Sequence, residues 1–220
     1  MEKLMKKALV IIVIMFLSAG MLAAFTLSDS TITVGGGFDT ISGTGRDIFT
    51  DEKFSSSTSG GLLYLFYDLK LGQTNWYSRL GYEYLLFPGD YVFKNTTYTK
   101  DSGYKRSASK NRGGVYYAFK PVSKIKLCLG ASITEISMTL TDKDYAVKQS
   151  NSFYAIGLIA DCLFMFTERF GARLSLCHDF IFFAMDRYRY AEKTYEIVMT
   201  QSEFSGGYAL GARIGLSYQF

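Results

Sequence analysis

Eight segments of this sequence alternate between apolar residues and small or polar residues, and this period of two sharply limits what the chain can form. Successive side chains of a β-strand point to opposite faces, so each segment predicts a strand with one apolar face. In the last segment, for example, Leu210, Ile214 and Leu216 alternate with Gly211 and Arg213. The expected strands span residues 31–38, 61–71, 76–87, 113–120, 124–138, 152–166, 170–185 and 206–220.

The connections between these segments alternate strictly between long and short. Polar stretches at 39–57, 88–111, 139–151 and 186–203 alternate with short turns at 72–75, 121–123 and 167–169. An even number of strands with tight turns at one end and long loops at the other is the layout of a transmembrane barrel. We therefore predict an all-β fold for residues 25–220, an eight-stranded antiparallel up-and-down transmembrane β-barrel with both termini at the end of the short turns.

Alternation alone also fits a soluble eight-stranded barrel of lipocalin type, which would place its apolar face inside and its charges outside. The glycine-rich polar face and the difference in loop length favour the opposite arrangement, with lipid outside. Aromatic residues near the expected strand ends suit two interfacial girdles; they include Phe38, Trp76, Tyr84, Tyr117 and Tyr154.

The first 24 residues predict a secretory signal peptide. Lys3, Lys6 and Lys7 precede a continuous apolar run over 8–17, and small residues follow up to Ala24. Cleavage there would leave 220 − 24 = 196 residues and change the net charge from +4 to (24 − 3) − (20 − 1) = +2. The charge of the mature chain therefore does not point to nucleic acid. The alternative is an uncleaved anchor helix.

The last segment ends on Phe220, with Tyr218 two positions before it and hydrophobic residues at alternate positions upstream. This pattern resembles the C-terminal assembly signal of bacterial outer-membrane β-barrels. In architecture the whole mature chain resembles the small eight-stranded barrels of that class, namely the OmpA transmembrane domain, the OmpX type and the OmpW type. The resemblance implies an outer-membrane location with periplasmic termini, contact with outer-membrane lipid and lipopolysaccharide, and recognition by the barrel-assembly machinery.

The inward faces of the expected strands carry charges of both signs, and an eight-stranded barrel leaves a lumen that side chains nearly fill. Such charges must pair, because an uncompensated buried charge costs several kcal/mol. We expect one network that plugs the barrel, formed by Arg79, Glu83, Asp161, Arg173, Asp179 and Arg213. The alternative is a narrow path for small solutes, hydrophobic ones as associated with OmpW-type barrels, which the apolar inward residues Phe66, Ile181 and Phe183 favour.

Basic and aromatic residues gather in two of the predicted loops. Lys105 and Arg106 lie in the segment 88–112, and Arg187 and Arg189 alternate with tyrosines in the last loop. Such residues suit lipopolysaccharide phosphates, acidic glycans, a host protein or a small molecule. The alternative is a solvated loop without a specific partner.

The sequence offers no constellation for catalysis. In the expected register His178, the only histidine, faces lipid. Cys128, Cys162 and Cys177 lie in mid-strand at wide spacing, which is neither a metal motif nor a disulfide framework. We therefore predict a non-enzymatic barrel without a catalytic site, a cofactor, a metal or a nucleic-acid partner.

Overall fold

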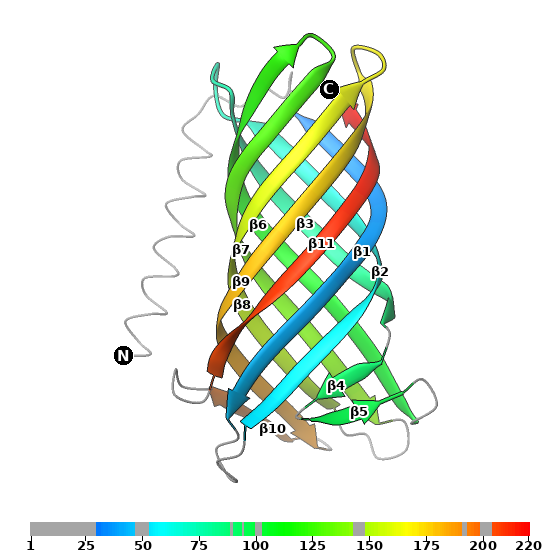
Figure 1. Cartoon of the computed structure of the whole chain (residues 1–220), viewed down its shortest axis with the longest axis vertical. Helices are drawn as coiled ribbons and strands as arrows, with labels where there is room; N and C mark the ends of the chain where they lie inside the picture. Colours follow the sequence, from blue (N-terminus) through cyan, green and yellow to red (C-terminus); the bar gives the residue numbers. More distant parts are fainter. Residues whose placement is uncertain are drawn as a thin grey trace.

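The computed structural model describes residues 30–46, 53–88, 90–93, 95–99, 103–142, 148–190, 193–198 and 204–220. The predicted signal peptide lies outside the described residues. Eight long strands form a closed antiparallel barrel (Figure 1). They are β1 (Thr31–Arg46), β2 (Lys53–Lys70), β3 (Trp76–Pro88), β6 (Tyr104–Val122), β7 (Ile125–Asp142), β8 (Lys148–Met165), β9 (Phe170–Tyr190) and β11 (Phe204–Gln219).

Each long strand pairs with the next one along the chain, and β1 closes the barrel by pairing with β11. At the end of the short turns, the backbone N–H of Phe220 donates a hydrogen bond of 3.0 Å to the carbonyl of Ser30. Three short strands lie at the opposite end, where the long connections are (Figure 1). They are the hairpin β4 (Tyr91–Phe93) and β5 (Thr96–Tyr98), which pairs with β2, and β10 (Lys193–Val198), which pairs with β9.

None of the described residues form a helix long and apolar enough to cross a membrane.

The barrel strands extend further than the sequence predicted, toward the end of the long connections. They contain 13 to 21 residues, whereas a tilted membrane crossing needs roughly 9–11. The predicted loop positions of Lys105 and Arg106 are wrong, because both residues belong to β6, and Arg187 and Arg189 likewise belong to β9. The expected boundaries followed the apolar outward residues, and hydrogen-bonded pairing continues where the outward residues become polar.

The outer wall carries a broad band of exposed hydrophobic side chains. Ile214 and Leu216 are 65 % and 70 % exposed, whereas Arg213 beside them on the strand is 1 % exposed and points inward. Large exposed hydrophobics also lie on the outward faces of the other barrel strands, for example Leu80 on β3 and Leu129 on β7. Water would not support an apolar surface of this extent. This arrangement, with charge inside and apolar residues outside, is the reverse of a lipocalin-type barrel.

The interior is layered rather than uniformly polar. Toward the long connections it is filled by an apolar cluster that includes Ile41, Leu85, Ile136, Phe153 and Ile181. Phe183 was expected to point inward, and this is wrong. The register of β9 against β8 shifts by one residue at Phe182, so that Phe183 pairs with the outward-facing Tyr154. Such a β-bulge turns every later side chain to the other face.

Candidate functional site

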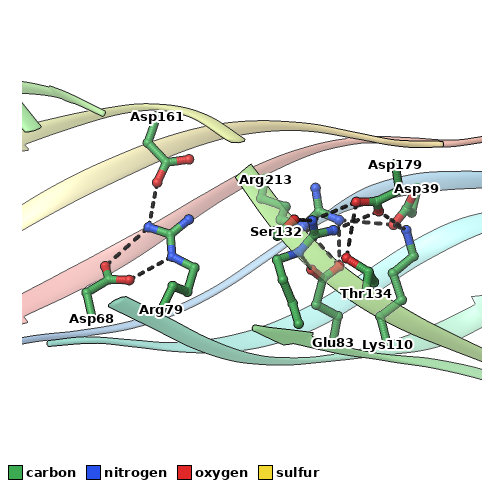
Figure 2. Close-up of polar contacts among 11 residues, drawn as sticks. Asp39, Asp68, Arg79, Glu83, Lys110, Ser132, Thr134, Asp161, Asp179 and Arg213 are labelled. Atoms are coloured by element: carbon green, nitrogen blue, oxygen red, sulfur yellow. Dashed lines mark hydrogen bonds and ion pairs between the residues drawn. The ribbon is translucent and has the colours of Figure 1, made fainter. Parts of the chain in front are cut away.

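The candidate site is the charged interior of the barrel. Ten charged side chains are buried among the described residues, five acidic and five basic, and each is at most 5 % exposed. They come from seven of the eight barrel strands and form two separate clusters (Figure 2). The ten residues are Asp39, Asp68, Arg79, Glu83, Lys110, Arg112, Asp161, Arg173, Asp179 and Arg213.

The cluster nearer the short turns consists of Asp68, Arg79, Asp161 and Arg173, and we call it the turn-side cluster. Arg79 lies directly opposite Asp68 on the neighbouring strand, and its Nε donates to Asp68 Oδ1 at 2.7 Å. Its Nη2 crosses the lumen to Asp161 Oδ2 at 2.6 Å (Figure 2). Arg173 Nη1 donates to the other oxygen of Asp68. Two carboxylates therefore meet two guanidinium groups, and the cluster is neutral.

Aromatic rings enclose the turn-side cluster. The guanidinium carbon of Arg79 lies 4.7 Å from the ring centre of Phe66 and 4.9 Å from that of Tyr116. Tyr116 in turn stacks on Tyr77 with ring centres 5.2 Å apart. Contacts of a cation with ring faces are worth about 2 kcal/mol or more when water is excluded. They help to offset the desolvation of Arg79.

The second cluster lies deeper in the barrel and is called the central cluster. Glu83 receives hydrogen bonds from Arg213 Nη2 at 2.5 Å and from Arg112 Nε at 3.1 Å. Arg112 also donates through Nη1 and Nη2 to the two oxygens of Asp179, at 2.7 and 2.8 Å. Such two-pronged contacts are the strongest form of ion pair and fix the geometry of the guanidinium.

Asp39 and Lys110 complete the central cluster. Lys110 Nζ lies 2.6 Å from Asp39 Oδ2 and 3.4 Å from Asp179 Oδ2, and Arg213 Nη2 donates to Asp39 at 3.0 Å. Three carboxylates and three cations again give a neutral cluster. No ion pair joins it to the turn-side cluster among the residues that the structure describes.

Glycines opposite the long charged side chains make room for them. Arg213 pairs with Gly37, Asp179 with Gly157, Arg173 with Gly215, and Arg112 with Gly81. The space beside Gly157 is filled by the network itself. A methyl group there would overlap Asp179 Oδ1 and lie 2.6 Å from Ser132 Oγ. A small barrel can hold so many guanidinium groups only if part of its inner wall carries no side chain.

Several polar atoms in this interior have no hydrogen-bond partner within the protein. They include Arg79 Nη1, Asp161 Oδ1, Arg173 Nε and Ser175 Oγ. These residues adjoin one another on the inner wall, since Ser175 pairs with Asp161 and lies two positions from Arg173 on β9. In Figure 2 the unbonded atoms of Arg79 and Asp161 point toward Arg213. Buried polar groups usually have a partner, which is often an ordered water molecule.

The structure brings together all six charged residues that the sequence placed in the lumen, but it divides them between two clusters. Arg79, Asp161 and Arg173 lie in one, and the other three lie in the central cluster. Four members of the two clusters were not part of the expected network. Asp68 was left out of it, and Asp39, Lys110 and Arg112 were placed in loops or beside them. Continuing the period of two beyond residues 38 and 113 would have found them, since Tyr116, Gly114, Arg112 and Lys110 share one face.

The predicted loop contacts do not belong to this site. Lys105 is exposed and Arg106 half-buried on β6, beyond the apolar band. For Arg187 and Arg189 the structure describes only the backbone, within β9.

His178 lies on the outer face, with its ring centre 4.3 Å from Phe180 and 6.4 Å from Tyr208. Its cross-strand neighbours are Leu158 and Leu210. The three cysteines are free. Among the described residues, no group of three or more His, Cys, Asp or Glu side chains could hold a metal ion.

Comparison with known proteins identifies the fold. No family model and no curated protein matches the sequence. Among solved structures, the outer membrane protein OprG from Pseudomonas aeruginosa aligns with a TM-score of 0.54 at 12 % identity, over 88 % of this chain and 96 % of that chain. A major outer membrane protein from Thermus thermophilus gives 0.51 and 13 %, over 87 % and 99 %. This is the fold of a small outer-membrane β-barrel. At such low identity the likeness concerns the fold alone, so the chemistry of this outer-membrane barrel fold must be argued from its own residues.

Proposed function

We propose that the protein is a non-enzymatic barrel of the bacterial outer membrane whose lumen is closed by its two ion-pair clusters. The observation that carries this proposal is the charge balance of the interior: five acidic and five basic side chains, all buried and all paired. Opening a path through either cluster would separate charges in a medium of low dielectric constant, which costs several kcal/mol per ion. The apolar cluster around Ile136 and Ile181 further closes the lumen toward the long connections.

Planar-bilayer recording tests the plug. We expect no steady conductance from the wild-type protein, because each of the ten charged groups described in the lumen is already held by a partner of opposite charge. Replacing Arg213 by alanine leaves Glu83 and Asp39 each short of a partner, so Arg213→Ala should show intermittent openings. A steady wild-type conductance would contradict the plug.

The second candidate function is a narrow channel for small solutes, hydrophobic ones included. One observation favours it: the unpartnered polar atoms around Ser175, which suit hydration. Uptake of small polar and hydrophobic solutes into vesicles separates the two functions. A channel predicts uptake that responds to Phe66→Ala, which widens the lumen beside Gly81. A plug predicts uptake no faster than through protein-free vesicles.

The part of the wall beyond the apolar band is the proposed surface for ligands, lipopolysaccharide or a host protein. Lys105 is exposed there, and Arg106 is adjacent to it. Anionic groups would meet these cations at the end of the long connections. This role is tested by comparing the binding of lipopolysaccharide to Lys105→Gln/Arg106→Gln and to the wild-type protein. Equal binding would show that these two residues do not bind lipopolysaccharide.

Tyr218 and Phe220 are proposed to form the signal that the barrel-assembly machinery recognises. The Phe220 ring is half exposed on the outer wall, 5.1 Å from Tyr218, which itself lies 5.0 Å from Phe170. Because so exposed a ring adds about 1 kcal/mol or less to the folded barrel, Phe220→Ala should refold in detergent nearly as well as the wild-type protein. In cells we expect much less of the variant in the outer membrane. Equal levels in cells would argue against the signal.

A further inference from the structure

The end of the barrel with the short turns carries a rim of cations. This turn rim comprises residues 70–76, 119–126 and 165–170, which include the three short turns and the adjoining strand ends. Of the six charged side chains that the structure describes there, five are basic and one, Glu168, is acidic. The five basic residues are Lys70, Lys120, Lys124, Lys126 and Arg169.

The apolar band of the outer wall reaches this end without a polar interval. Phe119 is exposed on the outer face and is followed directly by Lys120, and Phe170 is exposed directly after Arg169. Trp76 and Phe220 lie at the same margin, both about half exposed. Aromatic side chains of this kind occupy the boundary between hydrocarbon and headgroups.

The opposite end differs, because the strands continue well past the band. On β6 the outward residues after Gly113 are Asn111, Ser109, Ser107 and Lys105, so Lys105 lies eight residues beyond Gly113. At about 3.3 Å per residue along a tilted strand, Lys105 is far from the hydrocarbon region. The turn rim has no such extension. If the band is covered by lipid, the depth of the rim is therefore fixed at the level of the headgroups.

The cations of the rim differ in how they are held. Lys126 Nζ reaches across the mouth of the barrel and donates to Gln219 Oε1 at 2.6 Å, so this lysine points inward. Lys120, Lys124 and Arg169 are exposed. They come from two neighbouring turns, since β6, β7, β8 and β9 are consecutive in the wall. The exposed cations therefore gather on one side of the rim.

We propose that the turn rim binds the phosphate groups of anionic phospholipids in the leaflet that surrounds it. The proposal rests on the membrane location proposed above. A basic residue at an anionic membrane surface contributes about 1 kcal/mol, which is about a fivefold preference. The charge of the rim thus selects lipids with a net negative headgroup over zwitterionic ones, through the side that holds Lys120, Lys124 and Arg169.

Spin-labelled lipids test this proposal on the mature protein in vesicles. The motionally restricted fraction of labelled phosphatidylcholine measures the lipid in contact with the barrel. The same fraction for labelled phosphatidylglycerol measures selection for negative charge. We expect at least about a twofold preference for phosphatidylglycerol, decreasing in about 1 M salt because the headgroup contacts are screened.

The rim variant Lys120→Gln/Lys124→Gln should lose most of this preference. The control Lys53→Gln/Lys105→Gln removes two exposed lysines at the other end and should keep it. An equal preference in the rim variant and the wild-type protein, or an equal loss in the control, would overturn the proposal. If no restricted phosphatidylcholine is detected at all, the membrane location itself fails, and that failure is distinct from the loss of selectivity.

Discussion

At the scale of single residues, the inward-facing glycines decide how the charged interior packs. Gly157 on β8 pairs with Asp179 on β9, and the space that a side chain at residue 157 would fill is occupied by the ion pair between Arg112 and Asp179. Gly113, in contrast, lies on the outer face of β6 with no other heavy atom within 4 Å of where its Cβ would be. The same residue type therefore has different roles on the two faces of the wall.

Replacing Gly157 by alanine should destabilise the barrel. The added methyl group overlaps Asp179 Oδ1 and comes within 3.0 Å of Arg112 Nη1, so the ion pair must shift. Overpacking of this kind costs about 1–3 kcal/mol. Urea unfolding in lipid vesicles measures the change, with Gly113→Ala as the matched control. Equal urea midpoints for the two variants would show that the central cluster accommodates the added methyl group without loss of stability.

At the scale of the elements, the outward face of a long strand can have an apolar part followed by a polar part. β6 illustrates this, since its outward residues are apolar at Val115 and Phe119 and polar from Asn111 to Lys105. Pairing with β7 continues through both parts, as far as Tyr104 with Asp142. Backbone hydrogen bonds hold the strand in the sheet along both the apolar and the polar part, and only the outward side chains differ between the two parts.

Thiol labelling can locate the boundary on this wall. In a background with the three native cysteines replaced by alanine, we expect Lys105→Cys in nanodiscs to react with a charged maleimide within minutes. Leu129→Cys, on the outer face of β7 and 56 % exposed to its surroundings, should react only after the lipid is replaced by detergent. Rapid labelling of Leu129→Cys in nanodiscs would mean that water reaches the apolar band.

At the scale of the whole molecule, the interior consists of two neutral ion-pair clusters between an apolar cluster and an aromatic one. The turn-side cluster lies beside Tyr77 and Tyr116, and the central cluster lies between it and the apolar side chains around Ile136. Each cluster balances its own charge. The proposed plug therefore consists of two clusters, each of them neutral by itself.

Independent clusters should give additive effects on stability. Glu83→Gln and Arg213→Met remove two members of one network, and each alone costs about 3–5 kcal/mol because it leaves a buried partner unpaired. Combined, they should cost at least about 1 kcal/mol less than their sum. Asp161→Asn combined with Glu83→Gln should be additive within about 0.5 kcal/mol, since no bond links them. Strong coupling between Asp161 and Glu83 in urea unfolding would show that the clusters act as one.

The local sequence was sufficient to predict the barrel, its eight strands and the direction in which most side chains point. The period of two places Arg79, Glu83 and Arg213 on the inner face whatever their partners are, because it follows from the geometry of a single strand. The alternation of long and short connections likewise predicts which strands are neighbours, because a short turn can only join two strands that lie side by side and antiparallel.

The tertiary structure alone decided the ion pairs, the length of the wall and the position of the register shift. Asp39 meets Lys110 only because closure of the barrel brings β1 and β6 to opposite sides of a narrow lumen. Arg112 was taken for a loop residue because the outward side chains beside it are polar, and only the continued pairing with β7 shows that it lies inside. The sequence therefore determined the face of each residue, a local property, whereas its partner across the lumen depended on closure and stagger of all eight strands.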